Sequence, residues 1–260
     1  MYDSTAAGTD GLATTTPTPV RGVGEWLVAI DLDGTTIDAK GRASLAVKAQ
    51  LHRAEKAGHH LLVATGRSAA TALTVLDEIE VWPEYVVCSN GGMVLERDHQ
   101  AQTGYRPLRT ASFDVFPVVD LLRRELPSAR FAVEDEHGAF LYTHRFPPDT
   151  TEPEAAQTVV PFDRLAVGRA IRVVAIVPDC DVLLFRSVAK GLVLPGASFS
   201  LGWTPWLDIA ASGVSKASAA EELRVTLGFD RDRVMAVGDG YNDIELVQWA
   251  ARRGRGVAMG

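Results

Sequence analysis

A short apolar run that ends in two carboxylates constrains this chain more than any other stretch. Residues 26–30 have the length and β-branched content of a buried strand, and Asp31 and Asp33 follow at once, before Gly34 breaks the strand. Residues two apart on an extended backbone face the same way, so both carboxylates can point into one crevice. Two carboxylates this close indicate a bound metal, a shared proton or two different roles, and a solvated Asp-x-Asp-Gly turn is the alternative.

The apolar periodicity around this stretch predicts a parallel α/β sheet. Helices are expected over 44–57 and 68–78, and strands over 60–64 and 85–88, with a return to this pattern at 206–210, 215–227, 234–237, 244–251 and 256–259. Between them the pattern changes to short strand candidates at 93–97, 104–108, 130–135, 139–143 and 171–177, helices at 113–125 and 179–189, and a proline-rich loop with a short helix at 147–161. Strand and helix alternation at this spacing is typical of parallel α/β units, interrupted here by an α+β insertion.

The expected fold class is therefore α/β, with a Rossmann-like parallel-sheet core and an inserted α+β domain. Residues 1–22 are rich in Thr, Gly, Ala and Pro and are expected to form a disordered leader. The core is expected to comprise residues 23–91 and 203–260, and the insertion residues 92–202. Glycines near 90–92 and at 202 predict hinges at the two junctions.

Charge and cysteine content exclude several classes of function. The 26 Lys and Arg residues are outnumbered by 33 Asp and Glu residues, which gives a net charge of −7 and no basic surface for nucleic acid or anionic membrane. Cys88 and Cys180 are far apart and form no Cys-x-x-Cys pair, so a zinc site and a disulfide framework are not expected. Without a signal peptide or a membrane-spanning apolar run, we expect a cytoplasmic monomer or homodimer.

Further polar residues follow the other predicted parallel strands. Thr65 ends the second strand, Lys216 lies in the first turn of a helix, and Asp239 and Asp243 follow a late strand. Taken singly, these fit a helix cap, a solvated lysine and turn residues. Taken together, they would place four carboxylates, a hydroxyl and an amine at one sheet edge. Such a set suits Mg²⁺, a phosphorylated substrate, and a carboxylate that attacks phosphorus while a second one transfers protons.

Four segments, in this order along the chain, resemble the four motifs of the haloacid dehalogenase-like hydrolases: Asp31-Leu32-Asp33-Gly34-Thr35, Ala64-Thr65-Gly66-Arg67, Gly213-Val214-Ser215-Lys216 and Gly238-Asp239-Gly240-Tyr241-Asn242-Asp243. The similarity is closest to the Cof-type phosphatases, which carry an α/β cap of the C2 type after the third core strand. Ser89-Asn90-Gly91 resembles the hinge into that cap. Members of the family continue past a Gly-Val-Ala-Met-Gly segment with an Asn-Ala pair and a last helix, whereas the sequence given ends at Gly260.

The resemblance also implies the role of each site residue. Asp31 would be the nucleophile and Asp33 the general acid and base, while Thr65 would hydrogen-bond the transferring phosphoryl group and Lys216 would neutralise its charge. The implied Mg²⁺ ligands are Asp31, the backbone carbonyl of Asp33, Asp239 and Asp243. The implied phosphate and substrate contacts are Thr65, Gly66, Arg67, Asn90, Lys216 and Asn242, with Asn242 either contacting phosphate or orienting Lys216.

These features predict a Mg²⁺-dependent phosphatase for small phosphorylated metabolites, in particular sugar phosphates, with an aspartyl-phosphate intermediate. A phosphotransferase on the same core, such as a sugar phosphomutase, is a second hypothesis, because nothing in the sequence decides whether water reaches the intermediate. A non-catalytic binding protein that retained the fold is a third. Loss of Asp31, Asp33 or Lys216 would indicate it, and all three residues are present.

Overall fold

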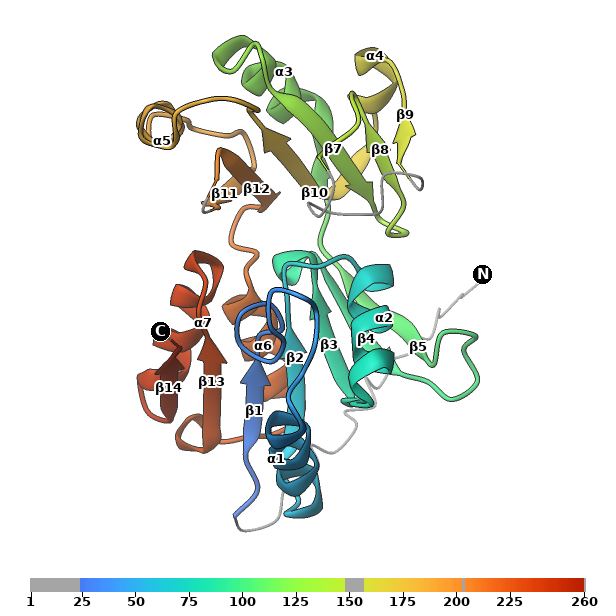
Figure 1. Ribbon diagram of the computed structural model, residues 1–260, viewed down its shortest axis with the longest axis vertical. Helices are drawn as coiled ribbons and strands as arrows, with labels where there is room; N and C mark the ends of the chain where they lie inside the picture. Colours follow the sequence, from blue (N-terminus) through green and yellow to red (C-terminus); the bar gives the residue numbers. More distant parts are fainter. Residues whose placement is uncertain (1–23, 148–156, 203, 260) are drawn as a thin grey trace, which may run out of the picture.

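The computed structural model describes residues 24–147, 157–202 and 204–259, and these form two β-sheets with helices packed against them (Figure 1). The expected leader at 1–22 lies outside the described residues, as does most of the expected loop at 147–161. Within the described part, the mixed α/β character and the parallel sheet confirm the expected fold class.

The first sheet has β1 in the middle of its five parallel strands. In spatial order its strands are β14 (Arg255–Ala258), β13 (Val234–Gly238), β1 (Leu27–Ile30), β2 (His60–Ala64), β3 (Tyr85–Cys88), β4 (Met93–Arg97) and β5 (Tyr105–Thr110). The strands from β14 to β3 run parallel, and β4 and β5 add an antiparallel edge. The carboxyl ends of β1, β2 and β13 therefore lie side by side at one edge of the sheet.

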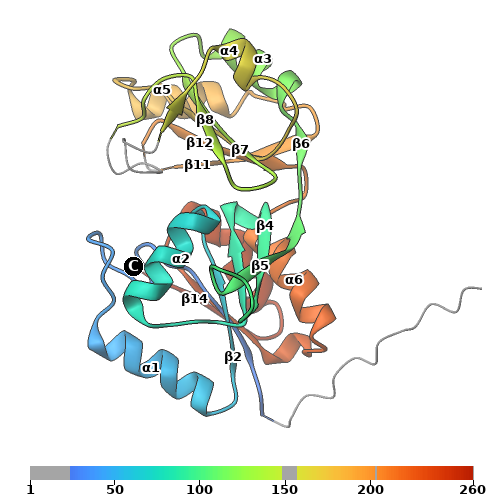
Figure 2. The ribbon, with the colours of Figure 1, turned by 90° about the vertical axis from the view of Figure 1, so that its right-hand side faces the viewer.

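Helices cover both faces of this sheet (Figure 2). On one face, α1 (Leu45–Lys56) and α2 (Ala69–Ile79) pack over a core cluster that includes Leu61, Val63 and Leu76. On the other face, α6 (Lys216–Thr226) and α7 (Ile244–Ala251) pack over a cluster that includes Leu62 and Ala236. Because strand residues alternate between faces, both faces of β2 are apolar along the run 61–64.

The second sheet carries its helices on one face only. Its spatial order is β11 (Ala197–Leu201), β12 (Trp206–Ala211), β10 (Arg169–Ile176), β7 (Arg130–Asp135), β8 (Phe140–Tyr142) and β9 (Thr158–Val159), with β6 (Phe113–Asp114) paired to β10. Helices α3 (Val115–Glu125), α4 (Phe162–Leu165) and α5 (Val182–Ala189) share one core cluster with this sheet. The opposite face is turned toward the first sheet (Figures 1 and 2). We call the part of the chain at 113–211 the insert.

The strand pairing corrects the expected boundaries of the inserted domain. The strands at 93–97 and 105–110, expected in the insertion, extend the first sheet, and the strand at 206–211, expected in the core, belongs to the second. A further strand, β11, was not predicted. The chain passes between the two sheets at 111–112 and 212–214, so the segments expected as hinges, 90–92 and 202, lie within the sheets and not at the crossings. Alternating side chains identify a strand but do not specify its partner, which explains the error.

Two other sequence expectations concern helices and cysteines. Among the described residues no helix is both long and apolar enough to cross a membrane. Both cysteines are free thiols, and Cys88 is fully buried at the end of β3, where burial raises the pKa of its thiol. The Cys88 thiol is thus a core group.

Candidate active site

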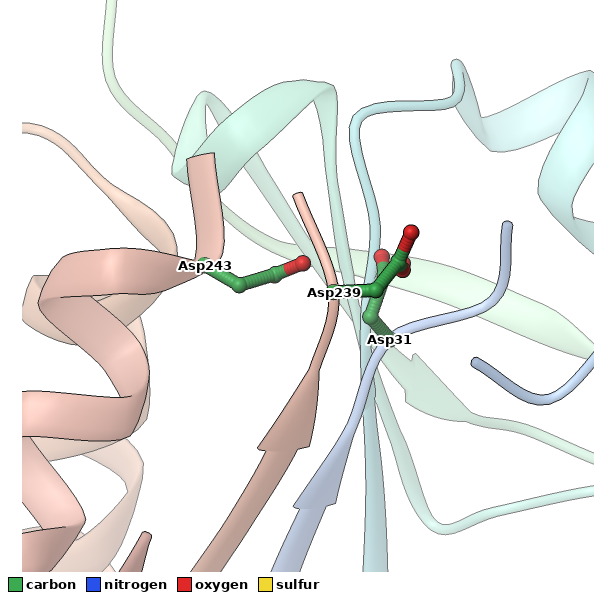
Figure 3. Close-up of side chains that lie close together, drawn as sticks. All are labelled: Asp31, Asp239 and Asp243. Carbon is green, nitrogen blue, oxygen red and sulfur yellow. The ribbon is translucent and has the colours of Figure 1, made fainter. Parts of the chain in front are cut away.

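Three carboxylates meet at the carboxyl edge of the first sheet (Figure 3). Asp31 follows β1, Asp239 follows β13, and Asp243 lies at the end of η4 (Tyr241–Asp243), where α7 begins. One carboxylate oxygen from each residue lies within 4.8 Å of the other two. A set of oxygen donors without sulfur or imidazole suits a hard divalent cation such as Mg²⁺ or Ca²⁺. These residues therefore fit the metal site that the sequence predicts.

Lys216 lies inside this acidic cluster. Its Nζ donates hydrogen bonds to Asp31 Oδ1 at 2.6 Å and to Asp243 Oδ1 at 2.7 Å, and the side chain is almost fully buried. The Ser215 side chain caps α6 and so fixes Lys216 at its first position. Burial alone lowers the pKa of Lys216, but Asp31 and Asp243 outweigh burial and raise it. The lysine is therefore a fixed positive charge beside Asp31.

Asp31 is the most perturbed acid of the site. Burial raises its pKa from 3.8 to about 7; Lys216 opposes this rise, and the negative charge of Asp243 adds to it. Asp31 and Asp243 are buried and share the Lys216 ammonium group, and the less buried Asp239 lies beside them, so the cluster carries an excess of negative charge. A divalent cation would offset that excess and favour the ionised form of Asp31.

The turn after β1 fits closely around Asp239. Gly34 has a φ of +80°, and a Cβ at this position would lie 2.2 Å from Asp239 Oδ2. Thr35 donates a hydrogen bond from Oγ1 to Asp239 Oδ1 at 2.9 Å. A glycine is required both by the left-handed backbone and by the close approach of the carboxylate. The Gly-Thr pair of the first motif thereby positions an acid that lies about two hundred residues further along the chain.

Asp33 does not join the carboxylate cluster. Its side chain is exposed and forms a two-point ion pair with Arg67, whose Nε and Nη2 lie 2.8 and 2.6 Å from the two carboxylate oxygens. The side chains of Asp31 and Asp33 therefore have different environments, which agrees with the hypothesis of two roles. The metal contact expected from Asp33 involves its backbone carbonyl, and it stays a prediction, as does a substrate contact by Arg67.

The remaining predicted residues form one hydrogen-bonded group at the ends of β2 and β3. Thr65 is buried, its Oγ1 accepts from Arg67 N at 3.1 Å, and its carbonyl accepts from Asn90 N at 3.1 Å. Asn242 Nδ2 donates to Asn90 Oδ1 at 2.9 Å, and the Asn90 amide lies against Gly66. Asn242 thus contacts Asn90, and it is Asp243 that contacts Lys216.

A cavity of about 290 Å³ separates this edge from the insert. Asn90, Lys216 and Asn242 line it on the side of the first sheet. On the insert side, Phe199, Ile209 and Ala210 line it together with four polar residues, Arg172, Asp208, Ser198 and Ser200. Sequence reasoning missed these four residues. A charge inside an apolar strand was the available signal, because Arg172 and Asp208 each interrupt such a run.

Arg172 and Asp208 form an ion pair at the cavity wall. Arg172 Nε lies 2.5 Å from Asp208 Oδ1, and Trp206 Nε1 donates to Asp208 Oδ2 at 2.9 Å. Glu134 lies directly opposite Arg172 in the β7–β10 pairing. Burial lowers the pKa of Arg172, but the two carboxylates outweigh it and raise the pKa. The guanidinium charge is thus neutralised within the insert.

Comparisons with known proteins agree with this geometry. The family model of the haloacid dehalogenase-like hydrolases matches residues 28–260. The putative phosphatase YxeH of Bacillus subtilis is 27% identical over 90% of this chain and 86% of its own length, and the pyridoxal phosphate phosphatase YbhA of Escherichia coli is 25% identical over 90% and 87%. A haloacid dehalogenase-like hydrolase structure from B. subtilis superposes with a TM-score of 0.71 over 86% of both chains at 17% identity, which supports the fold. The chain therefore belongs to the haloacid dehalogenase-like hydrolases.

Proposed function

We propose that this protein is a Mg²⁺-dependent phosphatase that hydrolyses small phosphorylated metabolites through an aspartyl-phosphate on Asp31. The observation that carries the proposal is the convergence of Asp31, Asp239 and Asp243 around the buried Lys216. The named phosphatase relatives support the same reaction class. YbhA is named for pyridoxal phosphate and YitU of B. subtilis, at 25% identity, for a phosphoribitylamino-uracil, so relatives differ in substrate.

The first step is attack on phosphorus by a carboxylate oxygen of Asp31. A bond forms between this oxygen and phosphorus while the bond to the leaving alkoxide breaks. Asp33, as the general acid, must leave its ion pair with Arg67 in the protonated form, and it then donates that proton to the leaving oxygen. Lys216, which already contacts Asp31, neutralises charge on the phosphoryl oxygens, and Thr65 donates a hydrogen bond to one of them. The result is an aspartyl-phosphate and a released alcohol.

The second step is hydrolysis of this intermediate. Asp33, now a carboxylate, takes a proton from a water molecule whose oxygen attacks phosphorus. The bond between phosphorus and Asp31 breaks, which releases inorganic phosphate and restores both carboxyl groups. The ion pair with Arg67 favours this carboxylate form of Asp33, which lies on the turn two residues beyond the nucleophile.

The residues that would hold Mg²⁺ are Asp31, Asp239, Asp243 and the backbone carbonyl of Asp33. When bound, Mg²⁺ supplies positive charge that neutralises the phosphoryl oxygens and keeps Asp31 ionised. The protein's own contribution is the arrangement of the acids. Gly34 and Thr35 hold Asp239 in place, and Lys216 orients Asp31 and Asp243.

The substrate class that the cavity favours is sugar phosphates. The insert presents a row of polar side chains on adjacent strands, because Ser200 is paired with Asp208, and Ser198 lies two residues before Ser200 on the same face. Asp208 neutralises Arg172, so this wall offers donors and acceptors without a net positive charge. Hydroxyl groups of a sugar suit such a wall better than a second anionic group does.

The test is phosphate release from an aryl phosphate and from a panel of sugar phosphates, with and without Mg²⁺. Wild type is compared with Asp31→Asn, and Asp232→Asn, which changes an exposed acid away from the site, serves as the matched control. Mg²⁺-dependent release that only Asp31→Asn abolishes supports the proposal. A folded wild type without turnover on any substrate refutes it and supports the binding-protein hypothesis. Transfer of phosphate to a sugar instead of water supports the phosphomutase.

A further inference from the structure

A buried hydrogen bond joins the insert to the first sheet beside the active site. Ser89, at the start of η1 (Ser89–Gly91), donates from Oγ to Glu134 Oε2 at 2.7 Å. Both residues are fully buried. Glu134 comes from β7 of the second sheet, on the face opposite to the helices of the insert, while Ser89 follows β3 of the first sheet. A buried carboxylate is costly unless it is hydrogen-bonded, so this contact ties the two sheets at a defined point.

The turn that Glu134 contacts has an unfavourable backbone. Ser89 has a φ of +49° and Asn90 a φ of +54°, a left-handed conformation that residues other than glycine rarely adopt. Two consecutive residues of this kind persist only where surrounding contacts hold them. Gly91 follows, and a Cβ there would lie 2.4 Å from the backbone oxygen of Ser215, next to Lys216. The turn is therefore held between the insert and the start of α6.

This turn supports the residues predicted to bind the phosphoryl group. Ser89 N donates to Arg67 O at 2.8 Å, and Asn90 N donates to Thr65 O at 3.1 Å, so the turn shapes the segment from Thr65 to Arg67. Asn90 Oδ1 accepts from Asn242. Asn90 Nδ2 lies buried beside Gly66 and has no hydrogen-bond partner among the described residues. A buried donor without a partner suits a phosphoryl oxygen.

We propose that Glu134 is a positioning residue: through Ser89 it holds the Ser89–Asn90 turn in the conformation in which Thr65 and Asn90 contact the phosphoryl group. This inference rests on the proposed phosphatase function. The insert would then have two roles. It lines the cavity, and through the contact of β7 with the Ser89–Asn90 turn it keeps Thr65 and Asn90 in position to bind the phosphoryl group. Ser89 carries the contact, and neither Ser89 nor Glu134 touches the reacting atoms.

The test combines phosphate binding with kinetics in variants of the full chain. Ser89→Ala and Glu134→Ala remove the hydrogen bond, whereas Glu134→Gln keeps an acceptor oxygen. Calorimetric titration with inorganic phosphate and Mg²⁺ should show roughly tenfold weaker binding for both alanine variants, as expected for loss of one buried hydrogen bond, and a smaller loss for Glu134→Gln, which keeps the acceptor oxygen but not the charge. The alanine variants should also show kcat/KM for an aryl phosphate lowered by a similar factor. The double variant Ser89→Ala/Glu134→Ala should bind phosphate as tightly as either single variant does, because both substitutions remove the same hydrogen bond.

Thr143→Val is the control for a merely structural effect. It removes a partly buried hydroxyl that accepts from Phe131 N at 2.9 Å within the insert. The hydrogen bonds of this hydroxyl are to Phe131 and His144 and not to the Ser89 turn. Thermal melts confirm that each variant is folded, and this control should bind phosphate as wild type does. Folded Ser89→Ala and Glu134→Ala proteins with unchanged phosphate affinity and kcat/KM would overturn the role of Glu134 alone. A wild type that neither binds nor releases phosphate would overturn the proposed function and this inference with it.

Discussion

Replacing Asp31 by asparagine should stabilise the metal-free protein while it abolishes catalysis. The raised pKa of Asp31 means that the folded state binds a proton more tightly than the unfolded chain does. Between pH 4 and pH 7 the folded state therefore holds more protons, and the free energy of unfolding falls as the pH rises through this range. Above pH 7 the folded wild type holds an ionised, buried Asp31, which lowers its free energy of unfolding. Asparagine carries no charge, so the substitution removes this destabilisation.

The magnitude follows from the two pKa values. A rise from 3.8 to about 7 corresponds, at about 1.4 kcal/mol per pH unit, to roughly 4 kcal/mol. Asparagine has nearly the shape of a protonated aspartate, so Asp31→Asn should raise the free energy of unfolding by up to this amount at pH 8. For a chain of this size the melting temperature should rise by about 10 °C.

Thermal and urea unfolding at pH 4 and pH 8, in a chelator and in saturating Mg²⁺, would check this prediction. In the chelator, the free energy of unfolding of Asp31→Asn should exceed that of wild type at pH 8. At pH 4 this difference should be small, because Asp31 is protonated in the folded wild type. Mg²⁺ should stabilise wild type more than Asp31→Asn and so narrow the difference, because it binds the intact carboxylate cluster. Asp232→Asn should leave all curves unchanged. An Asp31→Asn protein that is no more stable than wild type at pH 8 in chelator would refute the reasoning.

Three further substitutions test other parts of the site. Lys216→Met leaves buried carboxylates without their cation, so kcat/KM should fall at least a hundredfold and urea unfolding in chelator should show a loss of about 3–5 kcal/mol. Gly34→Ala places a Cβ 2.2 Å from Asp239 at a left-handed position, and calorimetry should show weakened Mg²⁺ binding; unchanged affinity would contradict the packing argument. Asp208→Asn removes the carboxylate charge that is paired with Arg172, so KM should rise for sugar phosphates but not for an aryl phosphate. Equal effects on both substrates would count against the proposal that this side of the cavity binds the sugar.

Local patterns in the sequence predicted the parts of the molecule that depend on local rules. Strands such as 60–64 and 85–88 were predicted from their apolar runs, which the structure buries on both faces. The four motifs end parallel strands or begin helices, and parallel strands end at the same sheet edge. That rule was sufficient to predict that Asp31, Asp239 and Asp243 would meet, although two hundred residues separate the first from the others.

Contacts between distant segments could not be predicted in this way. Strand pairing decides that residues 93–110 extend the first sheet and that 206–211 joins the second, and pairing depends on a partner that the local pattern does not name. The same holds for the ion pairs of Asp33 with Arg67 and of Arg172 with Asp208, and for the bond from Ser89 to Glu134.

The sequence by itself determined the α/β class, most of the elements and the acids of the site, because backbone periodicity and strand polarity are properties of short segments. Only the tertiary structure decided which carboxylate contacts which cation, which polar residues of the insert face the cavity, and how the insert meets the phosphate-binding turn. The physical reason is that burial and charge pairing depend on neighbours brought together by folding. The pKa of Asp31 illustrates this, because burial, Lys216 and Asp243 set it together, and only the folded chain assembles the three.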